Sequence, residues 1–135
     1  MPEPITRMNP ATLPDAGAMG YSQISVVEPG RMAFVSGQVA TQADGAEPPE
    51  SLLAQTRLAA SNARAALEAL GAGPQDIAML RIYAVDLTPA RLAEAYPEIT
   101  AFLAGARPSV TGIGVAALAA PNLQIELEMV VRLPD

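Results

Sequence analysis

The chain has 135 residues, half of them hydrophobic, and a formal net charge of −6 at pH 7, a size that fits one domain with a single core. It contains no Cys, His, Trp or Lys, which excludes disulfides, thiolate and Ser-His nucleophiles, lysine Schiff bases and the His or Cys ligands of zinc and copper sites. Its arginines are scattered rather than clustered, so this acidic chain is not expected to bind nucleic acid.

The N-terminal segment, residues 1–19, carries four prolines among small residues and is predicted to be an extended arm rather than a helix or strand. It lacks the basic and apolar regions of a signal peptide, and the chain has no run of about 18 apolar residues, so we expect a soluble, cytoplasmic protein without a membrane segment. YSQISVV (21–27) and RMAFVSG (31–37) flank a Pro-Gly turn, which predicts a two-stranded hairpin.

Two helices are predicted in the middle of the chain. Residues 51–70 repeat small and apolar side chains at helical spacing, and Gly71 is placed for a left-handed cap at the end of this helix. The Thr-Pro pair at 88–89 fits the N-cap and first turn of a second helix. This helix should reach about Gly105, with a break or kink at Pro97.

Further strands are predicted at 78–87, 109–117 and 123–133. The resulting order is strand, strand, helix, strand, helix, strand, strand. It predicts one α+β domain over residues 1–135, a two-layer sandwich with a mixed sheet and both helices on one face. The other face of such a sheet is left to water or to a partner.

The last predicted strand indicates which side chains lie on that open face. Its odd-numbered residues from Leu123 to Val131 are apolar and should pack under the helices. Glu126 and Glu128 alternate with them and should lie about 7 Å apart on the open face. Without His, Cys or Lys, proton transfer near neutral pH would use a carboxylate, a tyrosine or bound water. No acidic cluster has the spacing of a Mg²⁺ or Ca²⁺ loop, so we expect neither a metal nor a cofactor.

Six segments occur in the order and at the spacings of one known family. They are GYSQ (20–23), FVSGQVA (34–40), AQTRLAASNARAALEALGAG (54–73), RIYAVDL (81–87), IGVAAL (113–118) and LQIELE (123–128). On these segments the chain resembles the Rid superfamily, the YjgF-type reactive-intermediate deaminases, over nearly its whole length.

The resemblance implies a chorismate-mutase-like α+β fold that assembles as a homotrimer, with the sheets forming a barrel and small-molecule sites in the clefts between subunits. In the deaminases, a tyrosine at the position of Tyr21, the backbone of Ser36, Gly37 and Gln38, an arginine and a following backbone N–H hold a small imine or enamine acid. A glutamate at the position of Glu126 positions the hydrolytic water, and ammonia and a 2-oxo acid leave.

The chain departs from the deaminases at the arginine that binds the substrate carboxylate. That arginine lies eight residues before the leucine matching Leu118, a position that is Val110 in this sequence. Arg107 matches an earlier arginine that takes no part in catalysis. The chain therefore resembles the Rid subgroups without this arginine and should be a poor deaminase of 2-aminoacrylate or 2-iminopropionate. We place the substrate-binding residues at these positions: Tyr21, Ser36, Gly37, Gln38, Arg107, Val110, Thr111, Gly112 and Glu128.

Each of these residues also has a structural interpretation. Arg107 would be a solvated loop residue, Glu126 and Glu128 solvent-facing strand residues, and Tyr21 a residue packed at a sheet edge. Arg81, if buried in its strand, would need a carboxylate partner across the sheet. Three functions stay open: hydrolysis of a reactive imine or enamine, binding of a metabolite or partner protein without catalysis, and endoribonuclease or translation-inhibitor activity.

Overall fold

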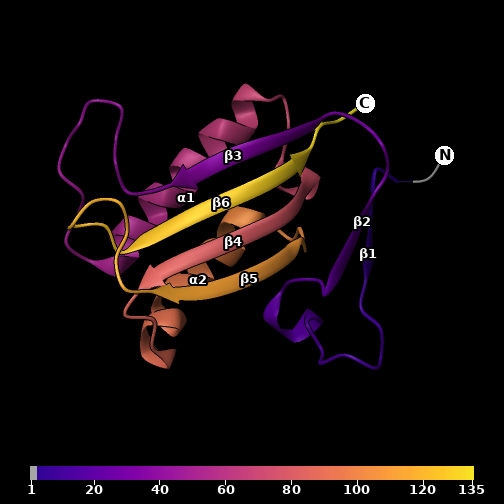
Figure 1. Ribbon diagram of the computed structural model, residues 1–135, viewed down its shortest axis with the longest axis horizontal. Helices are drawn as coiled ribbons and strands as arrows, with labels where there is room; N and C mark the ends of the chain where they lie inside the picture. The colour runs from indigo at the N-terminus through magenta and orange to yellow at the C-terminus, as the bar shows by residue number, and fades with distance from the viewer. Residues whose placement is uncertain (1–2) are drawn as a thin grey trace.

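The computed structural model describes residues 3–135, and its centre is a four-stranded sheet with both α-helices on one face (Figure 1). β4 and β5 run parallel and are joined through α2, whereas β6 pairs antiparallel with β3 and β4, so the sheet is mixed as predicted. The spatial order is β3 (Met32–Gln38), β6 (Ile125–Arg132), β4 (Ile77–Val85) and β5 (Ser109–Val115).

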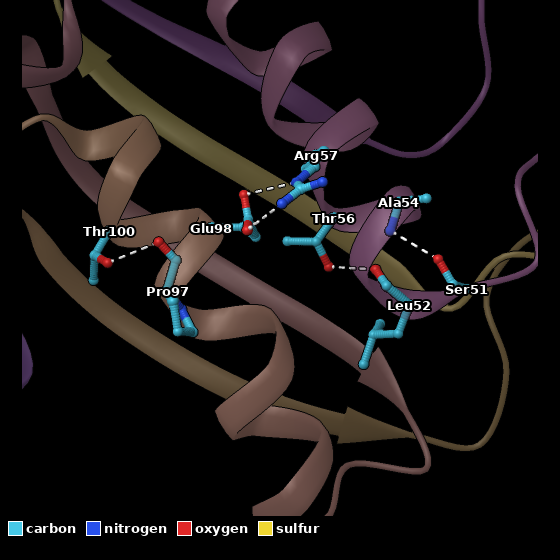
Figure 2. A network of polar contacts seen from close by, with 8 residues as sticks. All are labelled: Ser51, Leu52, Ala54, Thr56, Arg57, Pro97, Glu98 and Thr100. Carbon is cyan, nitrogen blue, oxygen red and sulfur yellow. Dashed lines mark hydrogen bonds and ion pairs between the residues drawn. The ribbon is translucent and has the colours of Figure 1, made fainter.

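Both helices begin directly after a residue that caps them, and the cap of the second helix, Thr88, was predicted. α1 (Leu52–Ala69) starts after Ser51, whose hydroxyl accepts a hydrogen bond from the N–H of Ala54 at 3.1 Å (Figure 2). Beyond its end, Gly71 has a φ of 66°, the left-handed conformation that favours glycine there.

α2 (Pro89–Leu103) starts after Thr88, whose hydroxyl accepts from the N–H of Arg91. It continues through Pro97 as one helix, so the predicted break at Pro97 is wrong. Pro97 is exposed, so its ring projects to solvent, and its carbonyl accepts from the hydroxyl of Thr100 at 3.0 Å (Figure 2).

The core lies between the helices and the sheet. As predicted, the odd-numbered residues of β6 face it: Ile125, Leu127, Met129 and Val131 are each buried. α1 and α2 pack on the same side, and Arg57 of α1 forms an ion pair with Glu98 of α2 at 3.1 Å (Figure 2). None of the helices within residues 3–135 is long and apolar enough to cross a membrane.

The N-terminal region differs from the prediction. β1 (Ile5–Met8) lies inside the segment expected to be an arm without strands, and it pairs antiparallel with β2 (Ile24–Val27). Short 3-10 helices cover Gly17–Met19 and Pro74–Asp76. Arg7 fixes β1 by donating to the hydroxyl of Ser25 and the carbonyl of Ile77, both at 2.7 Å.

The predicted hairpin does not form, because β2 pairs with β1 while β3 pairs with β6. The turn between β2 and β3 is held by Arg132, which is only 3% exposed and donates to the carbonyls of Glu28 and Pro29. A Cβ on Gly30 would lie 2.3 Å from the Arg132 Cζ, so only glycine lets the turn pack over this guanidinium. An isolated parallel bridge between Ser22 and Ser109 joins the end of the N-terminal pair to β5.

Candidate functional site

The predicted site residues lie on two opposite faces of the sheet. In the register of β4 with β6, Tyr83 is opposite Glu126 and Arg81 is opposite Glu128. In the register of β4 with β5, the buried Leu80 and Ile82 are opposite Val110 and Gly112. Residues directly opposite one another share a face. The two glutamates therefore lie on the open face, and Val110 and Gly112 lie on the face that carries the helices.

On the open face the two carboxylates have different surroundings. Glu128 accepts from the Arg81 guanidinium at 3.1 Å and from the Tyr83 hydroxyl at 3.2 Å. Arg81 thus has a carboxylate partner across the sheet, although its side chain is 40% exposed and not buried. Desolvation, and then the charge of Glu128, raise the pKa of Tyr83, which keeps its hydroxyl protonated as a donor. Within residues 3–135, no hydrogen bond or ion pair involves the Glu126 carboxylate.

Glu126 is placed by Gly37. A Cβ on Gly37 would lie 2.2 Å from the Cδ of Glu126, so the absence of a side chain is what lets the carboxylate lie over the backbone of β3. The β3–β6 register shifts between Val35 and Gln38, and Gln38 donates to the carbonyl of Ser36 at 3.0 Å. The Ser-Gly-Gln segment is therefore an irregular part of the strand, with its backbone next to a free carboxylate.

A hollow of about 300 Å³ adjoins these groups on the open face. Ser36, Arg81 and Glu128 line it together with Val130 and Phe34, whose side chain is 80% exposed. Thr111 is opposite Arg81 in the β4–β5 register and is exposed. It therefore belongs with the open-face group and not with its neighbours Val110 and Gly112.

The second group surrounds a separate cavity of about 160 Å³ at the edge of the helix-covered face. Sequence reasoning identified three of its residues, Tyr21, Val110 and Gly112, and missed the rest. The signal that could have found part of them is the spacing of Leu92 and Tyr96, which puts both on one face of α2. We call this cavity the Val110 pocket, and it is lined by Met19, Tyr21, Ile82, Leu87, Leu92, Tyr96, Val110 and Gly112.

The two tyrosines of the Val110 pocket differ in their partners. The Tyr96 hydroxyl donates to the carbonyl of Met19 at 2.7 Å. Burial, and then the neighbouring Tyr21, raise the pKa of Tyr96. Within residues 3–135, no hydrogen bond to the Tyr21 hydroxyl is formed, so Tyr21 is the tyrosine with a free donor. Gly112 faces open space, since a Cβ built on it would meet no atom within 4 Å.

Arg107 lies outside the Val110 pocket. It lines a neighbouring hollow of about 400 Å³ formed by the Gly17–Gly20 turn and α2, and the two hollows share Met19 and Tyr96. Its guanidinium is 3.3 Å from the place that a Cβ of Gly17 would take. Among residues 3–135, no group of three His, Cys, Asp or Glu side chains could hold a metal ion.

Comparison with known proteins places the chain in a family. The family model described as Endoribonuclease L-PSP matches residues 13–133. No curated protein matches the chain. Among solved structures, the chain is similar to YyfB of Yersinia pestis, a Rid-family protein of unknown function, with 38% identity and a TM-score of 0.91. That match covers 97% of this chain and 100% of YyfB.

Two structures from E. coli are more distant. The YjgF gene product is 28% identical with a TM-score of 0.69, over 83% of this chain and 87% of YjgF. TdcF, solved with bound serine, is 27% identical with a TM-score of 0.67, over 84% of this chain and 88% of TdcF. The family model and the likeness to YyfB each span nearly the whole chain, and they confirm what the sequence segments indicated: the chain belongs to the Rid (YjgF) family.

Proposed function

We propose that the protein hydrolyses a reactive imine or enamine in clefts between the subunits of a homotrimer, with Glu126 positioning the water. The observation that carries this proposal is the contrast between the two open-face carboxylates. Glu128 is held by Arg81 and Tyr83, whereas Glu126 lies unpaired over the backbone of Gly37. An unpaired carboxylate is free to position a bound water and to act on it as a general base.

The placement of the two groups on opposite sheet faces supports a site between subunits. A ligand that contacts the Glu126 carboxylate of one chain cannot also enter the Val110 pocket of that chain, because the sheet lies between them. In the proposed trimer, one subunit contributes Glu126 and the Ser36–Gln38 segment, and its neighbour contributes Tyr21 and the Val110 pocket.

The proposed reaction consumes one water. Glu126 accepts a proton from the water as its oxygen attacks the imine carbon, and the C=N electron pair moves to nitrogen, which is protonated. Glu126 then gives its proton to the nitrogen of the resulting carbinolamine. The C–N bond breaks, ammonia leaves, and the hydroxyl loses its proton to water to give a carbonyl compound. An enamine enters the same sequence after protonation at carbon gives the imine.

Val110 favours a substrate other than the small imino acids. Valine cannot give a carboxylate the forked, charge-assisted hydrogen bonds of an arginine. Arg107, the nearest arginine in sequence, lines a different hollow. TdcF, solved with serine, supports a small-molecule ligand for this fold, but its amino-acid ligand does not transfer to a pocket without a cation.

Ammonia release from a panel of imines generated in situ tests the proposal. At least one imine should be hydrolysed, and Glu126→Gln, which keeps the shape of the side chain, should lower its rate by about 100-fold or more. Glu128→Gln is the matched control two residues away and should cause a smaller loss.

Full activity of Glu126→Gln would show that the water-positioning role is wrong. A trimer that binds metabolites but hydrolyses none of the imines would favour the non-catalytic alternative. The endoribonuclease alternative requires salt-sensitive RNA binding, which a net charge of −6 disfavours.

A further inference from the structure

We propose that the Val110 pocket binds an uncharged hydrocarbon group of the ligand, so that the protein acts on neutral, apolar imines or enamines rather than on imino acids. This inference rests on the proposed function for the reaction, whereas the charge preference of the pocket rests on the residues of its walls. Its volume of about 160 Å³ is close to that of an apolar cavity that holds a benzene-sized guest, roughly 150 Å³. A branched alkyl group or a single ring would fill it.

The walls of the pocket carry no charged side chain. Ile82 of β4, Leu92 of α2 and Val110 of β5 supply hydrocarbon, and so does Leu87 from the connection between β4 and α2. A carboxylate placed among them would lose its hydration without gaining a cation, which is a large penalty for an ion. A hydrocarbon group would leave water at no such cost. The pocket therefore discriminates between ligands by charge.

The polar atoms of the pocket fix how such a ligand would lie. The Tyr96 hydroxyl is already committed to the Met19 carbonyl, so it does not compete for the ligand. The free hydroxyl of Tyr21 can donate to one acceptor at the rim, such as the imine nitrogen or the product carbonyl. A ligand with an apolar body and one acceptor matches this arrangement, and a carboxylate, which needs several donors, does not.

Gly112 lies at the open side of the pocket, where a substitution can test the role of the pocket in binding. A methyl group at this position would meet no protein atom within 4 Å, so Gly112→Ala adds volume inside the pocket without a clash. Such a variant separates the loss of binding space from a loss of folding. Ser61→Thr is the matched control, because it adds one methyl at an exposed position of α1, which contributes no residue to the pocket.

The experiment compares isovaleramide with isovalerate, which share a carbon skeleton and differ in charge. Binding to the intact protein is followed by the amide NMR shifts of Gly112 and Val110. Isovaleramide should bind at least about tenfold more tightly than isovalerate. Gly112→Ala should weaken the binding of isovaleramide by about tenfold or more, the usual effect of one methylene group in an apolar pocket. Ser61→Thr should change neither affinity, and Val110→Arg should reverse the preference in favour of isovalerate.

Three results would overturn the inference. They are equal or tighter binding of isovalerate by the unchanged protein, a folded Gly112→Ala variant with unchanged affinity for isovaleramide, and no binding of either probe because a neighbouring subunit fills the pocket. A preference for isovaleramide without hydrolysis of any imine would leave the inference standing and remove the proposed function. Hydrolysis that favours imines bearing a carboxylate would support the proposed function and overturn the inference.

Discussion

In the proposed mechanism, single residues determine the chemistry at two positions, and the first is Gly37. Its missing side chain makes room for the Glu126 carboxylate. Gly37→Ala should push this carboxylate away, because the new methyl and the Cδ of Glu126 cannot occupy the same space. The rest of β3 should hold, since the clashing atoms belong to a flexible side chain.

We therefore expect Gly37→Ala to lower imine hydrolysis by about 100-fold, on the scale of losing a general base, while the thermal midpoint changes little. Ammonia release and thermal unfolding measure the two effects. Combining Gly37→Ala with Glu126→Gln should cost no more than Glu126→Gln alone, because both changes remove the same group. Additive losses would show that Gly37 acts in some other way.

The second such position is Val110. Replacing Val110 with arginine puts a guanidinium into a pocket that has room for it, two residues before Gly112. The variant should gain measurable deaminase activity on 2-iminopropionate, because it can now form charge-assisted hydrogen bonds to the carboxylate. Arg107→Ala should change little in either background. If the unchanged protein were strongly active and Arg107→Ala abolished that activity, Arg107 would be the residue that binds the substrate carboxylate.

At the scale of elements, the Val110 pocket depends on contact between α2 and the turn before β2. Tyr96 of α2 provides this contact through its hydrogen bond to Met19. Removing the hydroxyl with Tyr96→Phe should cost about 1 kcal/mol of unfolding free energy, the usual net value of one hydrogen bond. Urea unfolding at neutral pH measures the loss, and an unchanged midpoint would mean that the turn is held by other contacts.

The same tyrosine predicts a pH dependence. The pKa of Tyr96 is raised by burial, and that of Tyr83 by desolvation and Glu128. A raised pKa means that stability is fully present below the unfolded pKa of about 10 and is lost as pH rises through the folded value. The urea midpoint should therefore fall above about pH 10, and the double variant Tyr83→Phe, Tyr96→Phe should show a shallower fall. An identical slope would assign the alkaline loss to other groups.

Elements with local signals could be predicted from the sequence, and elements with distant partners could not. The helical spacing within residues 51–70, the Thr88 cap and the alternation of β6 each lie within one segment, so both helices and the buried face were predicted. β1 was missed because its partner is 16 or more residues away along the chain and its anchor, Arg7, bonds to Ile77. Distant contacts also shape the site. Arg81 and Tyr83 of β4 donate to Glu128 and leave the Glu126 carboxylate unpaired, and no local sequence pattern shows this.

At the scale of the whole molecule, the open face of the sheet is the surface that most needs a partner. It carries Phe34 at 80% exposure beside the Arg81–Glu128 pair. We expect a homotrimer of the 13.9 kDa chain, and light scattering at micromolar concentration checks its mass. A stable monomer would remove the basis for a site shared between subunits.

The shared site can be tested by complementation between two inactive variants. Glu126→Gln removes the water-positioning half of every site, and Gly112→Val fills the other half. If each site takes one half from each of two neighbouring chains, trimers that contain both variants will include sites with two intact halves. Random mixing in equal amounts should restore about a quarter of the unmodified activity, since each half comes from the right chain with a probability of about one half. Co-expressed or refolded mixtures provide the measurement, with each variant alone as the control. If a single chain formed the whole site, mixing would restore nothing, and the opposite placement of Glu126 and the Val110 pocket would have no role in catalysis.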